Sequence, residues 1–163
     1  MRFSLFYFSA EAGGDAPYRL LTEGARFADR HGFTAVWTPE RHFGRFGGLY
    51  PNPSVLAAGL ATITERVELR AGSVVAPLHD AIRIAEDWAV VDNLSGGRVG
   101  ISFAPGWAPD DFVLAPDAYE RRRDVLRAHV DVVRRLWRGE TVRARNGLGV
   151  EVDEDVLKHH EVT

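Results

Sequence analysis

Residues 34–48 read Thr34-Ala-Val-Trp-Thr-Pro-Glu-Arg-His-Phe-Gly-Arg-Phe-Gly-Gly48, and this stretch decides the fold. It opens with β-branched, apolar and aromatic residues typical of a buried strand, and Pro39 ends that strand because proline has no N–H to donate to a sheet. Glu40, Arg41 and His42 therefore follow the carboxyl end of a strand, where parallel α/β folds carry their ligand-binding groups. The stretch predicts a functional loop. The alternative is an ordinary strand-to-helix loop whose charges are solvated.

Similar strands recur along the chain at a spacing of about thirty residues, each followed by a segment with the period of a helix. We expect strands at residues 2–8, 34–38, 68–75 and 98–103. The helices between them are expected to begin at the capping residues Asp15, Asn52 and Asp80, and at a capping box formed by Asp117 and Glu120. Parallel strands joined by helical crossovers predict an α/β fold.

The length of the chain limits how much of a barrel it can form. An eight-stranded TIM barrel needs roughly 250 residues, whereas this sequence has 163. We therefore expect a TIM-barrel-type (β/α) half barrel of about four βα units over residues 1–139. Residues 140–163 are expected to form a hairpin around Asn146-Gly147, a dipeptide typical of two-residue turns, and then a polar tail.

Composition excludes several classes of function. The net charge is −3, from 20 basic and 23 acidic residues, and no basic stripe is present, which argues against nucleic acid or a membrane as partner and leaves small molecules open. There is no cysteine, so any redox chemistry requires a bound cofactor. No signal sequence or membrane-spanning run is recognisable, and a cytoplasmic protein is therefore expected.

Several spaced motifs resemble one family. They are Trp37-Thr-Pro-Glu-Arg-His-Phe43, Gly47-Gly-Leu-Tyr-Pro-Asn-Pro-Ser54, Gly72-Ser-Val-Val-Ala-Pro-Leu-His79, and Glu86-Asp87 through Asp92-Asn-Leu-Ser-Gly-Gly-Arg-Val99. Together they resemble the bacterial luciferase-like flavin-dependent monooxygenases, in the branch found in natural-product biosynthesis, over residues 1 to about 145.

The resemblance implies a TIM barrel that binds reduced FMN, or the deazaflavin F420 in some branches. Such an enzyme reacts the flavin with dioxygen to oxidise a small organic substrate, and a flavin reductase supplies the reduced flavin. In the family the flavin phosphate is held largely by the second half of the barrel. The resemblance therefore also predicts weak FMN binding by a half barrel alone.

The resemblance assigns catalytic roles to the opening loop. The family usually shows Glu-His-His after its second strand; Glu40 and His42 match the outer positions, and Arg41 replaces the central histidine. A guanidinium stays protonated and is no general base, but it can stabilise an anionic oxygen. Histidine ordinarily titrates near neutral pH, so His42 is expected to move protons in the flavin pocket. Its alternative role is packing.

The resemblance places the cofactor against two later strands. Gly72 and Ser73 match the end of the third strand under the flavin ring, where the family often has a non-proline cis peptide bond. Ser102 and Ala104 match the position on the fourth strand that lines the isoalloxazine. The alternatives are a plain turn at the first pair and small residues in a tight place at the second.

Two other motif positions are expected to be structural. His79 and the Glu86-Asp87 pair are expected to cap the third helix and to pair with arginines such as Arg98, and no metal site is expected. A metal-dependent hydrolase using Glu40, His42 and His79 is the weaker rival function, because no His-x-His spacing is present. An F420-dependent oxidoreductase is another. A non-catalytic flavin-binding or assembly protein is the stronger rival, because a half barrel carries half of the site loops.

The edges of the expected sheet predict a homodimer. The first and fourth strands are apolar and contain no interior charge or proline that would block further pairing. Two copies could pair the fourth strand of each with the first strand of the other and close an eight-stranded barrel. A helix-mediated dimer of open half barrels is the competing arrangement, and a tail folded over one edge is the third.

Overall fold

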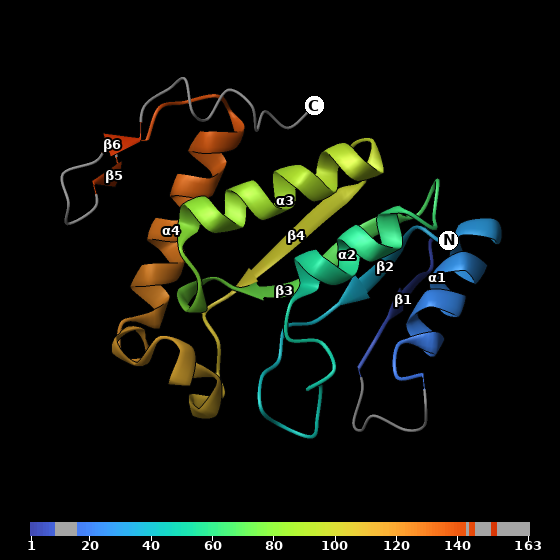
Figure 1. Ribbon diagram of the computed structural model, residues 1–163, viewed down its shortest axis with the longest axis horizontal. Coiled ribbons are helices and arrows are strands. Elements are labelled where there is room, and N and C mark those ends of the chain that lie inside the picture. The colour runs from blue at the N-terminus through green and yellow to red at the C-terminus, as the bar shows by residue number, and fades with distance from the viewer. Residues whose placement is uncertain (9–15, 143, 146–150, 153–163) are drawn as a thin grey trace.

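The computed structural model describes residues 1–8, 16–142, 144–145 and 151–152. Strands and helices alternate along the chain: β1 (Ser4–Phe6), α1 (Arg19–Arg30), β2 (Ala35–Thr38), α2 (Pro53–Ala61), β3 (Glu68–Val75), α3 (Ala81–Ser95), β4 (Val99–Ala104) and α4 (Arg122–Trp137). The strands form a parallel four-stranded sheet in the order β1-β2-β3-β4, and α1, α2 and α3 lie over one face of it (Figure 1). The α/β half barrel expected from the sequence is confirmed.

Two helices begin where local capping chemistry predicts. At the start of α2, the Asn52 side chain accepts a hydrogen bond from Val55 N at 3.1 Å. At the start of α3, Asp80 Oδ1 accepts hydrogen bonds from Ile82 N at 2.8 Å and Arg83 N at 3.2 Å. Both caps satisfy N–H groups that have no partner within the helix, so both helix starts are set by residues close in sequence.

The expected start of α4 is wrong. The helix begins at Arg122 and Arg121 provides no side-chain cap, whereas Asp117 lies in the short 3-10 helix η3 (Pro116–Ala118). Phe112 is a buried residue of the 3-10 helix η2 (Pro109–Leu114). The centroid of its ring lies 5.0 Å from that of the Tyr119 ring. This packing fixes the segment in 3-10 turns and delays the helix. The other expected cap, Asp15, lies outside the described residues, and α1 begins at Arg19 with no side-chain cap.

Strand β1 is shorter than the expected 2–8, and among the described residues it pairs only with the short strand β2. It pairs with β2 in the register Ser4↔Ala35, Leu5↔Val36 and Phe6↔Trp37. β2 spans only Ala35–Thr38, so little partner backbone is available to lengthen β1.

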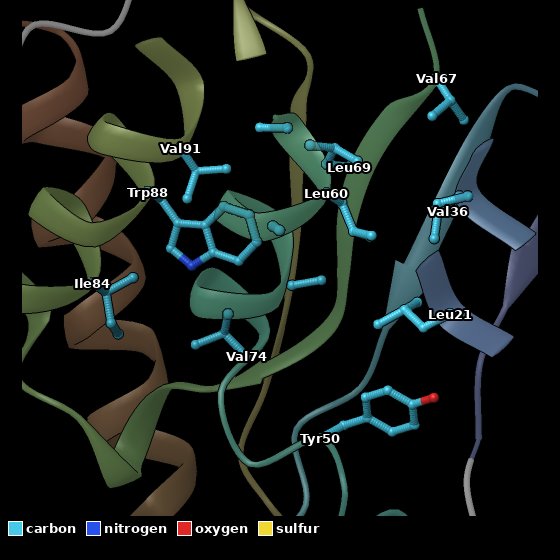
Figure 2. Close-up of a cluster of buried hydrophobic side chains, with 14 of the residues drawn as sticks. Leu21, Val36, Tyr50, Leu60, Val67, Leu69, Val74, Ile84, Trp88 and Val91 are labelled. Carbon is cyan, nitrogen blue, oxygen red and sulfur yellow. The ribbon is translucent and has the colours of Figure 1, made fainter. Parts of the chain in front are cut away.

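The core lies between the sheet and its helices. Leu69 from β3, Leu60 from α2 and Trp88 from α3 converge in it and are each at most 3% exposed (Figure 2). Leu21 of α1 and Val36 of β2 extend the same cluster towards β1. The helix face of the sheet is therefore well packed.

The opposite face of the sheet is open and aromatic. Phe6 and Phe8 are 45% and 57% exposed, and the Phe6 ring stacks on Trp37 with centroids 6.0 Å apart. Arg70 lies over the same indole at 4.9 Å and pairs with Glu68. In a closed barrel this face would line the interior.

The segment after α4 contains a short antiparallel ladder. β5 (Ala144–Arg145) pairs with β6 (Glu151–Val152), as a hairpin requires. The Asn146-Gly147 turn and the tail 153–163 lie outside the described residues, and the division of the chain at residue 139 stays a prediction. No helix in the described ranges is long and apolar enough to cross a lipid bilayer.

Candidate active site

A cavity of about 170 Å³ lies at the carboxyl ends of β2, β3 and β4. Parallel α/β folds bind their ligands at this end of the sheet. The lining residues come from the N-terminal segment, the loop after β2, the end of β3 and the segment after β4: Phe8, Pro39, Glu40, Arg41, Phe46, Gly72, Ser73, Val75, Ala104, Gly106, Trp107 and Asp111. The wall is largely apolar and carries a few charged groups, as ligand pockets do.

Most of the residues expected at the site lie on this wall. Glu40, Arg41, Gly72, Ser73 and Ala104 line the cavity. Ser102 joins them through Ser73, since the two hydroxyl oxygens are 3.2 Å apart. His42 does not line it; the imidazole is buried and contacts Glu40.

The carboxylate of Glu40 is the centre of a buried hydrogen-bond cluster. Its Oε1 lies 3.0 Å from His42 Nε2 and 2.5 Å from His79 Nε2, and its Oε2 accepts a hydrogen bond from Val75 N at 2.6 Å. The cluster therefore ties the loop after β2 to the end of β3 and to the segment that follows it.

The cluster shifts the acidities of its members. Burial alone would raise the pKa of Glu40, but the hydrogen bonds from His42 and His79, the charge of His79 and the Val75 N–H hold that pKa below its usual value. Burial alone would lower the pKa of His79, but the hydrogen bond to Glu40 and the charges of Glu40 and Asp87 raise it. Both shifts favour a carboxylate paired with an imidazolium.

Arg41 is held at the cavity by two residues from the segment after β4. Its guanidinium lies 4.4 Å from the centroid of the Trp107 ring, and its Nη1 is 3.4 Å from Oδ2 of the buried Asp111. Asp111 Oδ1 also accepts a hydrogen bond from His42 N at 3.2 Å. Within the described residues, Nε and Nη1 of Arg41 have no hydrogen-bond acceptor.

The backbone between Gly72 and Ser73 has an unusual geometry. The peptide bond is cis, as the family resemblance implies, and the pairing of β3 with β4 is irregular between Gly72 and Val74. A Cβ on Gly72 would lie 2.7 Å from the Phe6 ring and 3.0 Å from Trp37, so glycine permits the close approach of these aromatic side chains.

The structure corrects two expectations about structural residues. His79 was expected to cap α3, but the cap is Asp80 and the His79 ring contacts Glu40. Arg98 was expected to pair with Glu86 and Asp87, but those carboxylates pair with Arg83. Arg98 instead donates hydrogen bonds to backbone oxygens of Thr64, Val67 and Ser95, with distances between 2.7 and 2.9 Å.

Sequence reasoning missed Trp107, Asp111 and the aromatic residues Phe8 and Phe46. The argument that selected the loop after β2 applies equally to the segment after β4, where an indole and carboxylates follow Gly106. That signal was available in the sequence. The partnership of Asp111 with Arg41 and His42 was not, because they are about seventy residues apart in the chain.

Chemically, the site combines a flat apolar wall with one cation and a buried acid–base cluster. Phe8 and Phe46 in the wall stack with centroids 5.6 Å apart, and the Trp107 ring lies against the Arg41 guanidinium. Such a wall fits a planar ring, and Arg41 fits an anionic oxygen. In the described part of the chain, no group of three or more His, Cys, Asp or Glu side chains is arranged to hold a metal ion.

Comparison with known proteins identifies related chains. Residues 1–149 match the family described as luciferase-like monooxygenase. The chain is 34% identical over 147 residues to the oxygenase component of the flavin-dependent trigonelline monooxygenase of Acinetobacter baylyi, with 86% of this chain and 40% of that protein covered.

Two solved monooxygenase structures superpose on this chain. Monooxygenase RslO1 from Streptomyces bottropensis superposes with a TM-score of 0.83 at 30% identity, covering 94% of this chain and 47% of that one. The oxygenating constituent of 3,6-diketocamphane monooxygenase from Pseudomonas putida, solved with FMN, gives a TM-score of 0.79 at 17% identity, covering 100% and 47%. The chain thus spans less than half the length of these relatives.

Proposed function

The chain belongs to the luciferase-like monooxygenase family, and from this we propose that it oxidises a small organic molecule with dioxygen and reduced FMN. The observation that carries the proposal is the cavity at the carboxyl ends of β2, β3 and β4, which is lined by Arg41 together with Gly72 and Ser73. The presence of these features at the ligand-binding end of a parallel sheet supports an active site there.

The cavity fits the ring of the cofactor better than the whole molecule. Bound reduced FMN supplies the electrons that activate dioxygen. The cavity measures about 170 Å³, below the roughly 300–1,000 Å³ of a complete ligand pocket. Gly72, Ser73 and Ala104 would lie against the ring, with Ser102 behind Ser73. F420 is the alternative cofactor.

Arg41 would bind an anionic oxygen at this site. Its guanidinium is held against Trp107 and beside Asp111, and two of its donors lack an acceptor among the described residues. Arg41 also lines the cavity, so an anionic oxygen of a ligand would be favoured beside its guanidinium. Glu40 and His42 would hold and move a proton between Glu40 Oε1 and His42 Nε2.

We also propose a flavin reductase and a second copy of the chain as partners. The trigonelline relative is named as an oxygenase component, which supports a separate source of reduced flavin.

The exposed Phe6 and Phe8 on the open sheet face support a homodimer. Light scattering at micromolar concentration tests this: Phe8→Ser should shift a dimer towards monomer, whereas the helix-face control Val55→Ser should not. The cytoplasmic location and the place in natural-product biosynthesis stay predictions.

One experiment tests the oxygenase function. The purified chain is mixed with chemically reduced FMN without dioxygen, and oxidation of the flavin is followed after dioxygen is added. We expect binding to quench the fluorescence of oxidised FMN in a separate titration, and the reoxidation time course to differ from that of free flavin. A protein that neither binds FMN nor alters its reoxidation contradicts the proposal.

The second candidate function is a flavin-binding or assembly protein without oxygenase activity. The small cavity favours it, because walls that hold only the ring bind the cofactor weakly. This candidate predicts FMN binding with a reoxidation time course like that of free flavin.

A further inference from the structure

Glu40 is shared by two histidines that differ in their contact with solvent. The side chain of His42 is 9% exposed and that of His79 is 29% exposed, and both ring Nε2 atoms contact the same oxygen, Glu40 Oε1. We propose that His79 is a positioning acid–base residue of this site, which connects the buried Glu40 carboxylate to solvent and sets the charge that Glu40 presents to His42. The catalytic consequence rests on the proposed oxygenase function.

His79 lines a second, smaller cavity. It measures about 20 Å³, which is enough for one water-sized molecule. Glu40 and His79 line it together with Asn52 and Asp87, whereas the larger cavity is also lined by Glu40 but not by His79. Glu40 therefore lies at both the candidate active site and the smaller cavity, whereas His79 lines only the smaller one.

The groups around His79 favour its charged form. Glu40 faces it from the loop after β2, with His42 beyond that carboxylate, and Asp87 and Arg83 face it from α3. Arg83 Nη2 lies 3.1 Å from Asp87 Oδ1, so the carboxylate of Asp87 offsets the positive charge of Arg83 near the imidazole. The α2 side contributes the uncharged Asn52 and Ser54. The raised pKa of His79 agrees with this arrangement.

The ring of His79 is separable from its structural role in the backbone. His79 N donates a hydrogen bond to Ala76 O at 3.1 Å at the end of η1 (Ala76–Leu78), and this contact does not involve the side chain. Glutamine at position 79 keeps a side-chain N–H donor for Glu40 but cannot titrate. His79→Gln therefore removes the proton exchange with little change in the local fold.

The first test uses the ligand-free chain. Nuclear magnetic resonance follows the titration of each imidazole among the six histidines. His79 is expected to titrate above the ordinary value of about 6.5, and Asp87→Asn and Glu40→Gln should each lower its midpoint, the second by about one pH unit or more. Asp87→Asn leaves Glu40 in place, so the test survives if Glu40→Gln does not fold. A His79 midpoint that neither substitution moves overturns the proposal.

The second test is the pH profile of FMN reoxidation. His79→Gln keeps a hydrogen-bond donor for Glu40 but removes the charge of His79, which is one of the causes that lower the pKa of Glu40, so the acid limb for this variant should move to higher pH. The matched control is His129→Gln, since His129 Nδ1 contacts Ala76 O and lies outside both cavities. A uniform loss of rate without a shift of the limb overturns the proposal. A chain that shows the His79 coupling but does not act on flavin overturns only the oxygenase function.

Discussion

The guanidinium of Arg41 lies over the indole of Trp107, 4.4 Å from the ring centroid, at the wall of the candidate active site. Trp107 is 72% exposed, so the contact contributes little to the core. Its importance is local, because a flat aromatic surface keeps the cation beside the cavity.

Trp107→Ala should weaken FMN binding several-fold and leave the thermal midpoint nearly unchanged. The variant loses a cation–π contact, typically worth about 0.5–2 kcal/mol, together with part of the cavity wall. Fluorescence quenching of FMN measures the affinity. Trp107→Phe should retain most of it, and Val113→Ala, a change at an exposed residue of the same segment outside the cavity, should have no effect. Equal affinities for Trp107→Ala and the parent protein would contradict this role.

Asp111→Asn should destabilise the chain by about 2–3 kcal/mol. The carboxylate is 3.4 Å from Arg41 Nη1 and accepts the hydrogen bond from His42 N, so its neutralisation leaves a largely buried cation without its counter-ion. Chemical denaturation monitored by circular dichroism gives the free energy of unfolding. The neighbouring Asp110 is exposed, and Asp110→Asn is the control expected to stay within about 0.5 kcal/mol. Similar losses from both changes would show that the buried pair is not the cause.

Asp29 should make the stability of the chain depend on pH in the acid range. Its carboxylate accepts hydrogen bonds from the N–H groups of Glu65, Arg66 and Val67 at 3.1, 2.7 and 2.8 Å. Burial alone would raise its pKa, but these hydrogen bonds and the charge of Arg66 lower it. The pKa of Asp29 is lower in the folded state than in the unfolded state, where it is about 4. The stabilisation is therefore complete above the unfolded-state pKa and is lost as pH falls through the folded-state pKa.

Asp29→Asn should therefore cost about 2 kcal/mol at neutral pH and flatten the acid branch of the stability curve. The measurement is the free energy of unfolding by denaturant across the acid range. Asp124→Asn serves as control, since that side chain is 79% exposed. An acid branch of equal steepness in Asp29→Asn and the parent chain would rule out this carboxylate as its source.

Gly72→Ala should destabilise the chain by about 1–3 kcal/mol because the added methyl group overpacks the open face. It would lie 2.7 Å from the Phe6 ring. Phe6→Ala in the same chain should recover part of the loss, and a double-mutant cycle measures that coupling. Gly59→Ala is the control: nothing lies within 4 Å of its Cβ position in α2, so helix propensity should make this change neutral or stabilising. Absence of coupling between positions 6 and 72 would contradict the close approach.

Much of the fold followed from patterns that are local in the sequence. Asn52 and Asp80 begin their helices because their side chains accept hydrogen bonds from backbone N–H groups within three residues. Gly96 ends α3 in the left-handed backbone conformation. The capping box at Asp117 failed because the packing of Phe112 against Tyr119, a contact that local patterns do not encode, fixes that segment.

The sequence by itself determined the order of strands and helices, and it predicted a site loop at the end of β2 and, by resemblance, Gly72, Ser73 and Ala104, all of which line the cavity. Only the tertiary structure decided the partners of the charged residues. Glu40 meets His79, 39 positions away, and Arg41 meets Asp111, because the carboxyl ends of β2, β3 and β4 lie side by side. Periodicity and capping act within a turn or a strand, whereas which buried carboxylate faces which cation depends on how separate strands meet.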